Sequence, residues 1–282
     1  MWSLMAVMSA VLLGLYDVAK KKALQKNGVL AVLLVATALS TLFLSPFFKL
    51  GPGEDYIRLA FKAVLVTLSW ISGMIGLKML PLTTVSTIKG SRPVFVVLLS
   101  VLIYSEKLNW MQWSGIALAL IALWMLGRSS HSDGTVKARR TGFIFMGVSV
   151  ATGVASAVYD KHIISGMDPL FVQCWTNLFI TVLLAICVGV QLFARERSSF
   201  QKIQWDWTLL VVAVLITAAD MLYFFALKQP GALLSVISVV RRGSILVTFV
   251  CGAILFKEGN LKAKGLNMLV MVAGIVLLLL GS

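Results

Sequence analysis

Apolar residues form ten long runs along this chain, and short segments with charged residues, proline or glycine separate them. Most runs are close to the roughly 20 residues that an α-helix needs to cross a bilayer. They do not alternate in polarity, as the strands of a membrane barrel do. The pattern therefore predicts ten membrane-spanning helices, at residues 4–19, 29–48, 59–77, 82–104, 108–126, 141–159, 170–193, 207–227, 231–256 and 263–281.

The composition excludes a soluble domain. Hydrophobic residues make up 59% of the 282 residues and charged residues only 13%, which is too little polar surface to cover a water-soluble fold. The longest polar connections, around 128–140 and 194–206, are short, so any chemistry has to lie within the helix bundle. The first run lacks a basic leader and a small-residue cleavage site, and we expect it to be retained as a helix.

The net charge of +14 would indicate a nucleic-acid partner in a soluble chain. Here most lysines and arginines lie in short connections beside helix ends, where they are expected to contact lipid headgroups, and no nucleic-acid partner is expected. No nucleotide-binding loop, hydrolase motif or metalloprotease motif occurs, so the chain is not predicted to be an enzyme. Three cysteines lie in apolar runs without metal-ligand spacing, and we expect neither a metal nor a cofactor: Cys174, Cys187 and Cys251.

The second half of the chain repeats the first. A basic cluster stands within an apolar run in each half, and a glutamate beside a lysine follows each cluster; the clusters are residues 88–93 (Ile-Lys-Gly-Ser-Arg-Pro) and 239–244 (Val-Val-Arg-Arg-Gly-Ser). Residues 14–17 (Gly-Leu-Tyr-Asp) are echoed by 157–160 (Ala-Val-Tyr-Asp). We therefore predict a first five-helix repeat, a connecting loop and a second five-helix repeat, at residues 1–127, 128–140 and 141–282.

The distribution of basic residues predicts an orientation. Connections one, three, five, seven and nine carry more than twice as many lysines and arginines as the connections on the opposite side. By the positive-inside rule, both chain termini then face outward. Five helices per repeat is an odd number, so the second repeat enters the membrane from the other side, and the two repeats are expected to be inverted.

The two basic clusters hold the candidate substrate-binding residues. A charge at the centre of a membrane helix costs about 2.5–3.5 kcal/mol, so each one requires a partner or a function. Arg241 would lie near the middle of a helix spanning 231–256. Lys89 and Arg92 share one helix face, which Ser86 extends by one turn, and Ser238 stands in the same relation to Arg241. These residues either bind substrate or form structural ion pairs within the bundle.

Asp220 is the natural counter-ion because it lies well inside the eighth run. In the first repeat Trp70 occupies the corresponding position, and we count it among the substrate-binding candidates. Asp220 forms a static pair with Arg241 or Arg242, or it acts as a proton acceptor that couples transport. Glu106, which follows the fourth run, is expected to cap a helix or to form a loop salt bridge at the membrane interface.

Asp17 and Asp160 are repeated acids near helix ends, and each precedes a lysine, Lys20 or Lys161. The simpler interpretation is an ion pair with that lysine beside an interfacial aromatic residue. The functional interpretation is a hydrated cavity mouth in which the aspartates set the local charge. Three tyrosines are predicted to line the cavity: Tyr16, Tyr159 and Tyr223.

The order and spacing of these motifs resemble the EamA family of the drug/metabolite transporter superfamily over essentially the whole chain. Residues 76–78 and 226–228 are similar to the small-Leu-Lys end of the family's third helix, and residues 92–95 and 104–107 to its Pro-Val-Phe and Gly-Glu-like motifs. The resemblance implies ten helices in two inverted repeats, a central cavity lined by helices three, four, eight and nine, and alternating access. It also implies cytoplasmic termini, opposite to the charge count, so the orientation stays open.

Three functions are compatible with this pattern. The first is a secondary active transporter that moves a small polar or anionic metabolite through a central basic cavity, similar in its cations to the sugar-phosphate translocators. The second is a proton-coupled exporter of neutral or amphipathic compounds. The third is a membrane scaffold or auxiliary subunit, which would gain nothing from buried cations. The expected partners are a small-molecule substrate, the lipid bilayer and, for the exporter, protons. We expect a multi-pass protein of the plasma (inner) membrane.

Overall fold

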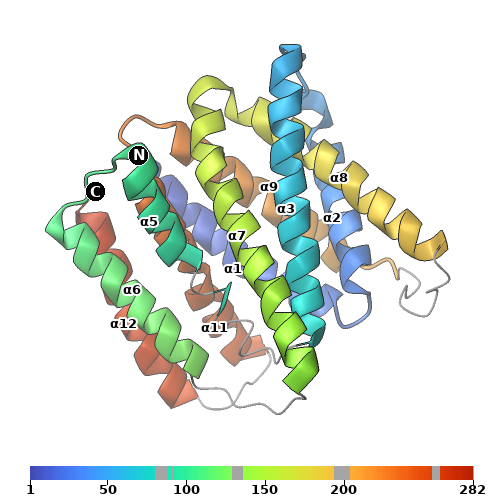
Figure 1. The fold of residues 1–282 in the computed structure, drawn as a ribbon. Helices are drawn as coiled ribbons and strands as arrows, with labels where there is room; N and C mark the ends of the chain where they lie inside the picture. Colours follow the sequence, from blue (N-terminus) through green and yellow to red (C-terminus); the bar gives the residue numbers. More distant parts are fainter. Residues whose placement is uncertain (80–87, 90–91, 129–135, 194–203, 256–260, 282) are drawn as a thin grey trace.

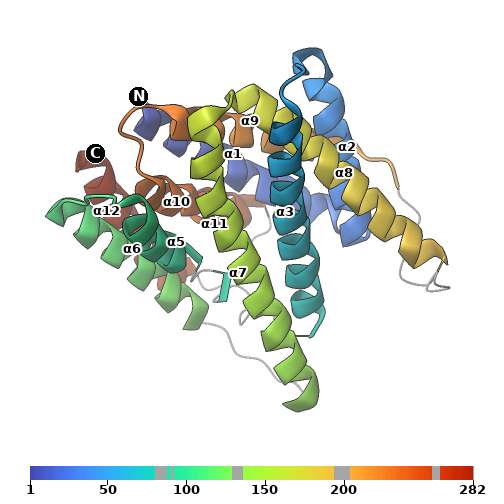
Figure 2. The same ribbon diagram turned by 45° about the horizontal axis from the view of Figure 1, so that its top comes forward.

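The computed structural model describes residues 1–79, 88–89, 92–128, 136–193, 204–255 and 261–281, and within them every regular element is a helix. The helices form one bundle, with the two chain ends close together on one side (Figures 1 and 2). The elements are α1 (Trp2–Ala23), α2 (Val29–Leu44), the 3₁₀ turn η1 (Ser45–Phe47), α3 (Gly53–Met79), α5 (Arg92–Tyr104), α6 (Trp110–Arg128), α7 (Val136–Gly166), α8 (Pro169–Phe193), α9 (Trp207–Lys228), α10 (Leu234–Arg242), α11 (Ser244–Leu255) and α12 (Leu261–Leu280).

The lengths of these helices suit a multi-pass membrane protein. In the described part of the chain, six helical segments are long and apolar enough to cross a bilayer, namely α1, α2 together with η1, α3, α7, α8 and α9. Shorter apolar helices lie at Arg92–Tyr104, Trp110–Ala122 and Leu269–Leu280. The prediction of an all-helical, multi-pass membrane protein is confirmed, and the number of ten spans stays a prediction.

The ninth apolar run, at 231–256, does not form one helix. It is divided into α10 and α11 at Gly243, whose N–H donates to the carbonyl oxygen of Val240 at 2.8 Å. A Cβ atom at Gly243 would lie 2.8 Å from that oxygen and 2.8 Å from a methyl carbon of Ile275, so this tight turn suits glycine. The prediction of a continuous helix is wrong here, and Arg241 lies at the end of a short helix, where the helix dipole favours a cation.

The helices of the first half of the chain pack mainly against helices of the second half. The most extensive packing joins α3 with α7 and α1 with α9, so the third long helix of each half lies along the first helix of the other half. Ser9 of α1 donates its hydroxyl to the carbonyl oxygen of Ala219 in α9 at 2.7 Å. α6 and α12, the final helices of the two halves, also pack side by side (Figure 1). A seam between the two halves therefore runs through the middle of the bundle.

Asp206 joins the connection after α1 to the start of α9. It accepts hydrogen bonds from the Lys26 ammonium at 2.9 Å and from the Thr208 N–H at 3.3 Å. The hydrogen bond from Lys26, followed by that from Thr208, lowers the pKa of Asp206 below its ordinary value. The carboxylate is therefore ionised at neutral pH, and it caps α9 outside the apolar span.

Candidate functional site

α3 and α7 approach each other closely through small residues. The Ser69 hydroxyl donates to the Ser149 carbonyl oxygen at 2.7 Å, and the Ser149 hydroxyl donates to the Ser69 carbonyl oxygen at 2.6 Å. Gly73 and Gly153 stand four residues further along their helices, the small-xxx-small spacing that lets membrane helices touch. A Cβ atom at Gly73 would lie 2.7 Å from the Ser149 hydroxyl oxygen. These residues bring the two halves into direct contact at the seam.

The Arg92 guanidinium, at the start of α5, fills the space left by Gly153. A Cβ atom on Gly153 would lie 1.1 Å from Nη2 of Arg92. This nitrogen donates to the Ser69 hydroxyl at 3.3 Å, and the Nε–H of Arg92 is buried without a hydrogen-bond partner among the described residues. Nζ of Lys89 lies 3.4 Å from the Cβ position of Gly73. Lys89 and Arg92 thus point toward the same seam, in agreement with their spacing.

Gly153→Ala is expected to destabilise the fold by about 1–3 kcal/mol, because the new methyl group overlaps the Arg92 guanidinium. The double variant Gly153→Ala/Arg92→Ala should recover part of this loss. Unfolding of the detergent-purified protein measures both. Gly147→Ala is the matched control, since a Cβ atom there meets nothing within 4 Å. Equal stability of the two glycine variants would show that Arg92 does not occupy this space.

Arg241 forms the second part of the site, at the end of α10. Its Nη2 donates to Oδ1 of Asp220 at 2.7 Å, and its guanidinium carbon lies 4.2 Å from the centre of the Tyr223 ring. The Nε–H of Arg241 is also buried, again without a partner in the part of the chain that the structure describes. Of the two arginines that the sequence offered to Asp220, the structure pairs it with Arg241.

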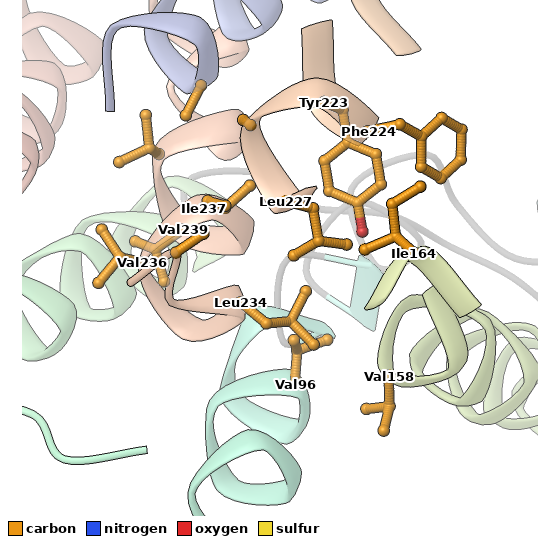
Figure 3. Packing of buried hydrophobic residues seen from close by; sticks show 14 of the residues in the cluster. Val96, Val158, Ile164, Tyr223, Phe224, Leu227, Leu234, Val236, Ile237 and Val239 are labelled. Carbon is orange, nitrogen blue, oxygen red and sulfur yellow. The ribbon is translucent and has the colours of Figure 1, made fainter. Parts of the chain in front are cut away.

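Tyr223 connects Arg241 to a buried ion pair. Its hydroxyl donates to Oδ2 of Asp160 at 3.2 Å, and Figure 3 shows this hydroxyl directed toward α7. Lys62 of α3 pairs with the other oxygen of Asp160, and its ammonium lies 4.2 Å from the centre of the Phe224 ring. The side chains of Lys62 and Asp160 are only 4% and 9% exposed. A continuous chain of polar contacts therefore links α10, α9, α7 and α3.

The expected pairing of Asp160 with Lys161 is wrong. Adjacent residues on a helix point about 100° apart, so the two side chains leave α7 in different directions. Asp160 turns inward to Lys62, which lies inside α3. Lys161 pairs with Glu106, which is buried, so the expected salt bridge of Glu106 is present.

Three aromatic candidates lie away from this network. Trp70 packs among apolar side chains of α2, α3 and α8. Tyr159 packs edge-on against Phe61 of α3, with ring centres 5.4 Å apart. Tyr16 packs with apolar residues of α1, α2 and α9, and the Lys20 ammonium lies 5.3 Å from the centre of its ring. The structure brings Tyr223, but not these three aromatic residues, into contact with Arg241.

Asp17 belongs to a neighbouring cluster near the end of α1. It is exposed, and it interacts electrostatically with Lys20 and Arg242. Arg242 therefore interacts electrostatically with Asp17, whereas Asp220 forms its ion pair with Arg241. Ser238 is half-buried on α10, one turn before the arginines. Ser86 lies outside the described residues.

Sequence reasoning missed the residues that hold the arginines and aspartates in place. Ser69, Ser149 and Gly153 are signalled only by small-xxx-small spacing, which recurs in many membrane helices. Lys62 has a stronger signal, because it interrupts an apolar run four residues after Arg58. Its partner Asp160 could not be identified from spacing, since the two residues are 98 positions apart.

No group of three or more histidine, cysteine, aspartate or glutamate side chains that could hold a metal ion occurs within the described ranges. Cys174 is buried, Cys187 and Cys251 are half-buried, and all three are free thiols. The described arginine, lysine, aspartate and tyrosine side chains of this site offer ion pairing and hydrogen bonding.

Comparison with known proteins gives a family and a fold. The family model of the EamA-like transporter family matches residues 1–128 and again residues 140–280. A comparison with curated proteins finds no match. Among solved structures, one protein crystal structure aligns with a TM-score of 0.77 at 14% sequence identity, covering 100% of this chain and 99% of that chain. At that identity the likeness shows the fold alone.

Proposed function

We propose, because this chain belongs to the EamA-like transporter family, that it moves a small organic anion across the membrane through a site between Arg92 and Arg241. Membership confirms the family resemblance and fits a multi-pass membrane transporter rather than an enzyme. The anionic substrate, the inverted arrangement of the two repeats, alternating access and the plasma membrane as location are parts of the proposal.

The observation that carries the proposal is the pair of unsatisfied arginine donors. The Nε–H groups of Arg92 and Arg241 are both buried without a hydrogen-bond partner among the described residues. Leaving a buried donor unpaired costs about 1–3 kcal/mol, and more for a charged group. A carboxylate or phosphate offers several acceptor oxygens and matches the planar guanidinium well. An anion between the two arginines would satisfy both donors.

The balance of charge also favours an anion. Asp220 matches the charge of Arg241, and Asp160 matches that of Lys62. Within the described residues, Arg92 contacts the neutral hydroxyl of Ser69 and no carboxylate. A cation inside a membrane protein is costly without a partner, so a substrate that brings a negative charge stabilises this arrangement.

The packing between helices of the two halves supports alternating access. Arg92 lies against Gly153 at the seam between α3 and α7, which come from different halves of the chain. The pair of Asp220 and Arg241 lies in the second half, in α9 and α10. Movement of one half against the other would therefore change access to a site at this seam.

A thermal-stability screen tests the proposal. The detergent-purified protein is melted with carboxylates, phosphorylated compounds, neutral compounds and cations. A ligand that binds the folded state raises the melting temperature with concentration. We expect stabilisation by anions and its loss in Arg241→Gln. Stabilisation by neutral or cationic compounds that persists in Arg241→Gln would contradict the proposal.

The bond between Asp220 and Arg241 favours a second candidate, a proton-coupled exporter in which this pair opens when Asp220 is protonated. The Asp220→Asn variant separates the two functions. For the anion transporter, we expect Asp220→Asn to keep or to strengthen anion binding, by up to about tenfold, because Arg241 is released from its partner. Loss of pH-gradient-driven transport, with no anion binding, would instead support the exporter.

A further inference from the structure

A pocket of about 650 Å³ lies at the end of the bundle where α5, α7 and α9 terminate. Three lysines line it, Lys107, Lys161 and Lys228, with one acid, Glu106. The Lys228 ammonium donates to the carbonyl oxygens of Ser165 and Met167, both at 3.1 Å. An ammonium group has three N–H donors, so Lys228 keeps one for a ligand. The charge of this pocket is suited to an anion.

Glu106 balances the charge of only one of these lysines, Lys161, and the rest of its carboxylate is turned into the protein. It accepts from the N–H groups of Leu234 and Ser235 at 2.8 and 3.2 Å, and from the Ser235 hydroxyl. It also pairs with Lys161. Leu233, the residue before α10, provides no side-chain cap. Glu106 therefore caps α10 from the end of α5 and ties the two halves together at this face of the bundle.

The residue before Glu106 is held in an unusual conformation. Ser105 has φ = 51° and is the only non-glycine residue with positive φ in the described part of the chain. This left-handed conformation costs a non-glycine residue about 1–2 kcal/mol. It turns the chain at the end of α5, where the Tyr104 hydroxyl donates to the Val158 carbonyl oxygen at 2.6 Å. We call Tyr104, Ser105 and Glu106 the latch.

Only one apolar layer separates the pocket from the charged network. Ile164 and Leu227 line the pocket, and they are 1% and 5% exposed. Asp160 and Tyr223 stand four residues earlier on the same helices, a rise of about 6 Å. Figure 3 shows Ile164 and Leu227 close to Tyr223 in this layer. The pocket therefore lies directly outside the proposed transport site.

We infer that this pocket is a vestibule for the anionic substrate, and that the latch separates it from the central site in this conformation. The inference rests on the proposed function for the identity of the passing anion. The lysines that line the pocket support the vestibule, and the bonds that Glu106 makes with α10 support the latch. For an anion to pass, the Glu106 carboxylate has to leave α10 so that the apolar layer can separate.

Charged thiol reagents test the vestibule without any substrate. Gln229→Cys, on the pocket wall, is made in a chain whose three native cysteines are replaced by alanine. Its rates are measured with an anionic sulfonatoethyl and a cationic trimethylammonioethyl methanethiosulfonate. Relative to a free thiol in solution, we expect the anionic reagent to be favoured by about tenfold or more, and Lys228→Gln to reduce this preference severalfold. Equal rates for both reagents would overturn the vestibule.

A second cysteine tests the latch. Val158→Cys lies beside the latch, because the Tyr104 hydroxyl donates to the Val158 carbonyl oxygen, and this position is only 9% exposed. We expect Glu106→Gln to accelerate its modification by about tenfold, because the amide cannot pair with Lys161. Ser105→Gly should slow modification, since glycine adopts this φ without strain. Glu54→Gln is the control, because the Glu54 side chain is 85% exposed. An unchanged rate in both Glu106→Gln and Ser105→Gly would overturn the latch.

Lipid headgroups are the other source of anions for this pocket. The Gln229→Cys rates are therefore compared in phosphatidylcholine vesicles and in vesicles that contain phosphatidylglycerol. A preference for the anionic reagent in both supports a vestibule for a soluble anion, whereas its loss only with phosphatidylglycerol would assign the pocket to lipid headgroups. None of these rates depends on Arg92 or Arg241, so failure of the vestibule and failure of the proposed function give different results.

Discussion

Arg92→Gln is expected to weaken anion binding and transport by about 30-fold or more. Removing one partner of a buried, hydrogen-bonded charge pair costs about 2–5 kcal/mol, and 1.4 kcal/mol corresponds to a factor of ten. Arg92→Lys keeps the positive charge but lacks the planar guanidinium with its paired N–H donors, so we expect an intermediate loss of anion binding and transport. The measurements are the ligand-induced rise in melting temperature and the initial rate of uptake into vesicles.

The control for this prediction is Arg140→Gln on α7, since Arg140 is exposed. Its binding and transport should equal those of the native chain. If Arg92→Gln folded normally and bound the same anion with unchanged affinity, Arg92 would be a structural residue and the substrate site would lie elsewhere.

Lys62→Met and Asp160→Asn are each expected to destabilise the protein by about 3–5 kcal/mol. Each change leaves the other member of a buried pair uncompensated, and that is far more costly than the pair itself is worth. The double variant Lys62→Met/Asp160→Leu should recover most of the loss, apart from the unpaired Tyr223 hydroxyl. Chemical unfolding of the detergent-solubilised protein, followed by fluorescence or circular dichroism, measures these differences.

Arg58→Met is the matched control for the buried pair. Arg58 lies one turn earlier on α3, its side chain is 52% exposed, and it approaches Glu54 and Asp55 at 3.7 Å. An exposed pair of this kind contributes about 0–1 kcal/mol. If Lys62→Met cost no more than Arg58→Met, the pair between Lys62 and Asp160 would be hydrated rather than buried.

The helices follow largely from the pattern of apolar residues. The predicted runs at 170–193 and 207–227 differ from α8 and α9 by a single residue at an end, because polar residues and a proline define their limits. The run at 231–256 gave a wrong result. Its mean polarity is compatible with one helix. The helix nevertheless breaks at Gly243, which lies close to Ile275 of α12, and such a contact between distant segments cannot be read from the local sequence.

The candidate site was predictable where a charge interrupts an apolar run. Arg92, Arg241 and Asp220 could be selected because their burial in a membrane is costly, and the structure pairs two of them. The contact between Lys62 and Asp160 was not predictable, because it joins helices from different halves of the chain. The same holds for Glu106, whose bonds to α10 span more than a hundred residues of sequence.

The central claim is that an anion crosses the membrane at the seam between the two halves. The most direct test is uptake of a radiolabelled form of the best stabilising anion into vesicles containing the purified protein, with Arg241→Gln in parallel. Our account predicts saturable uptake by the native chain and loss of at least about nine-tenths of it in Arg241→Gln, consistent with the cost of removing a buried charged partner. Equal uptake by the two chains, at equal amounts of folded protein, would contradict the account.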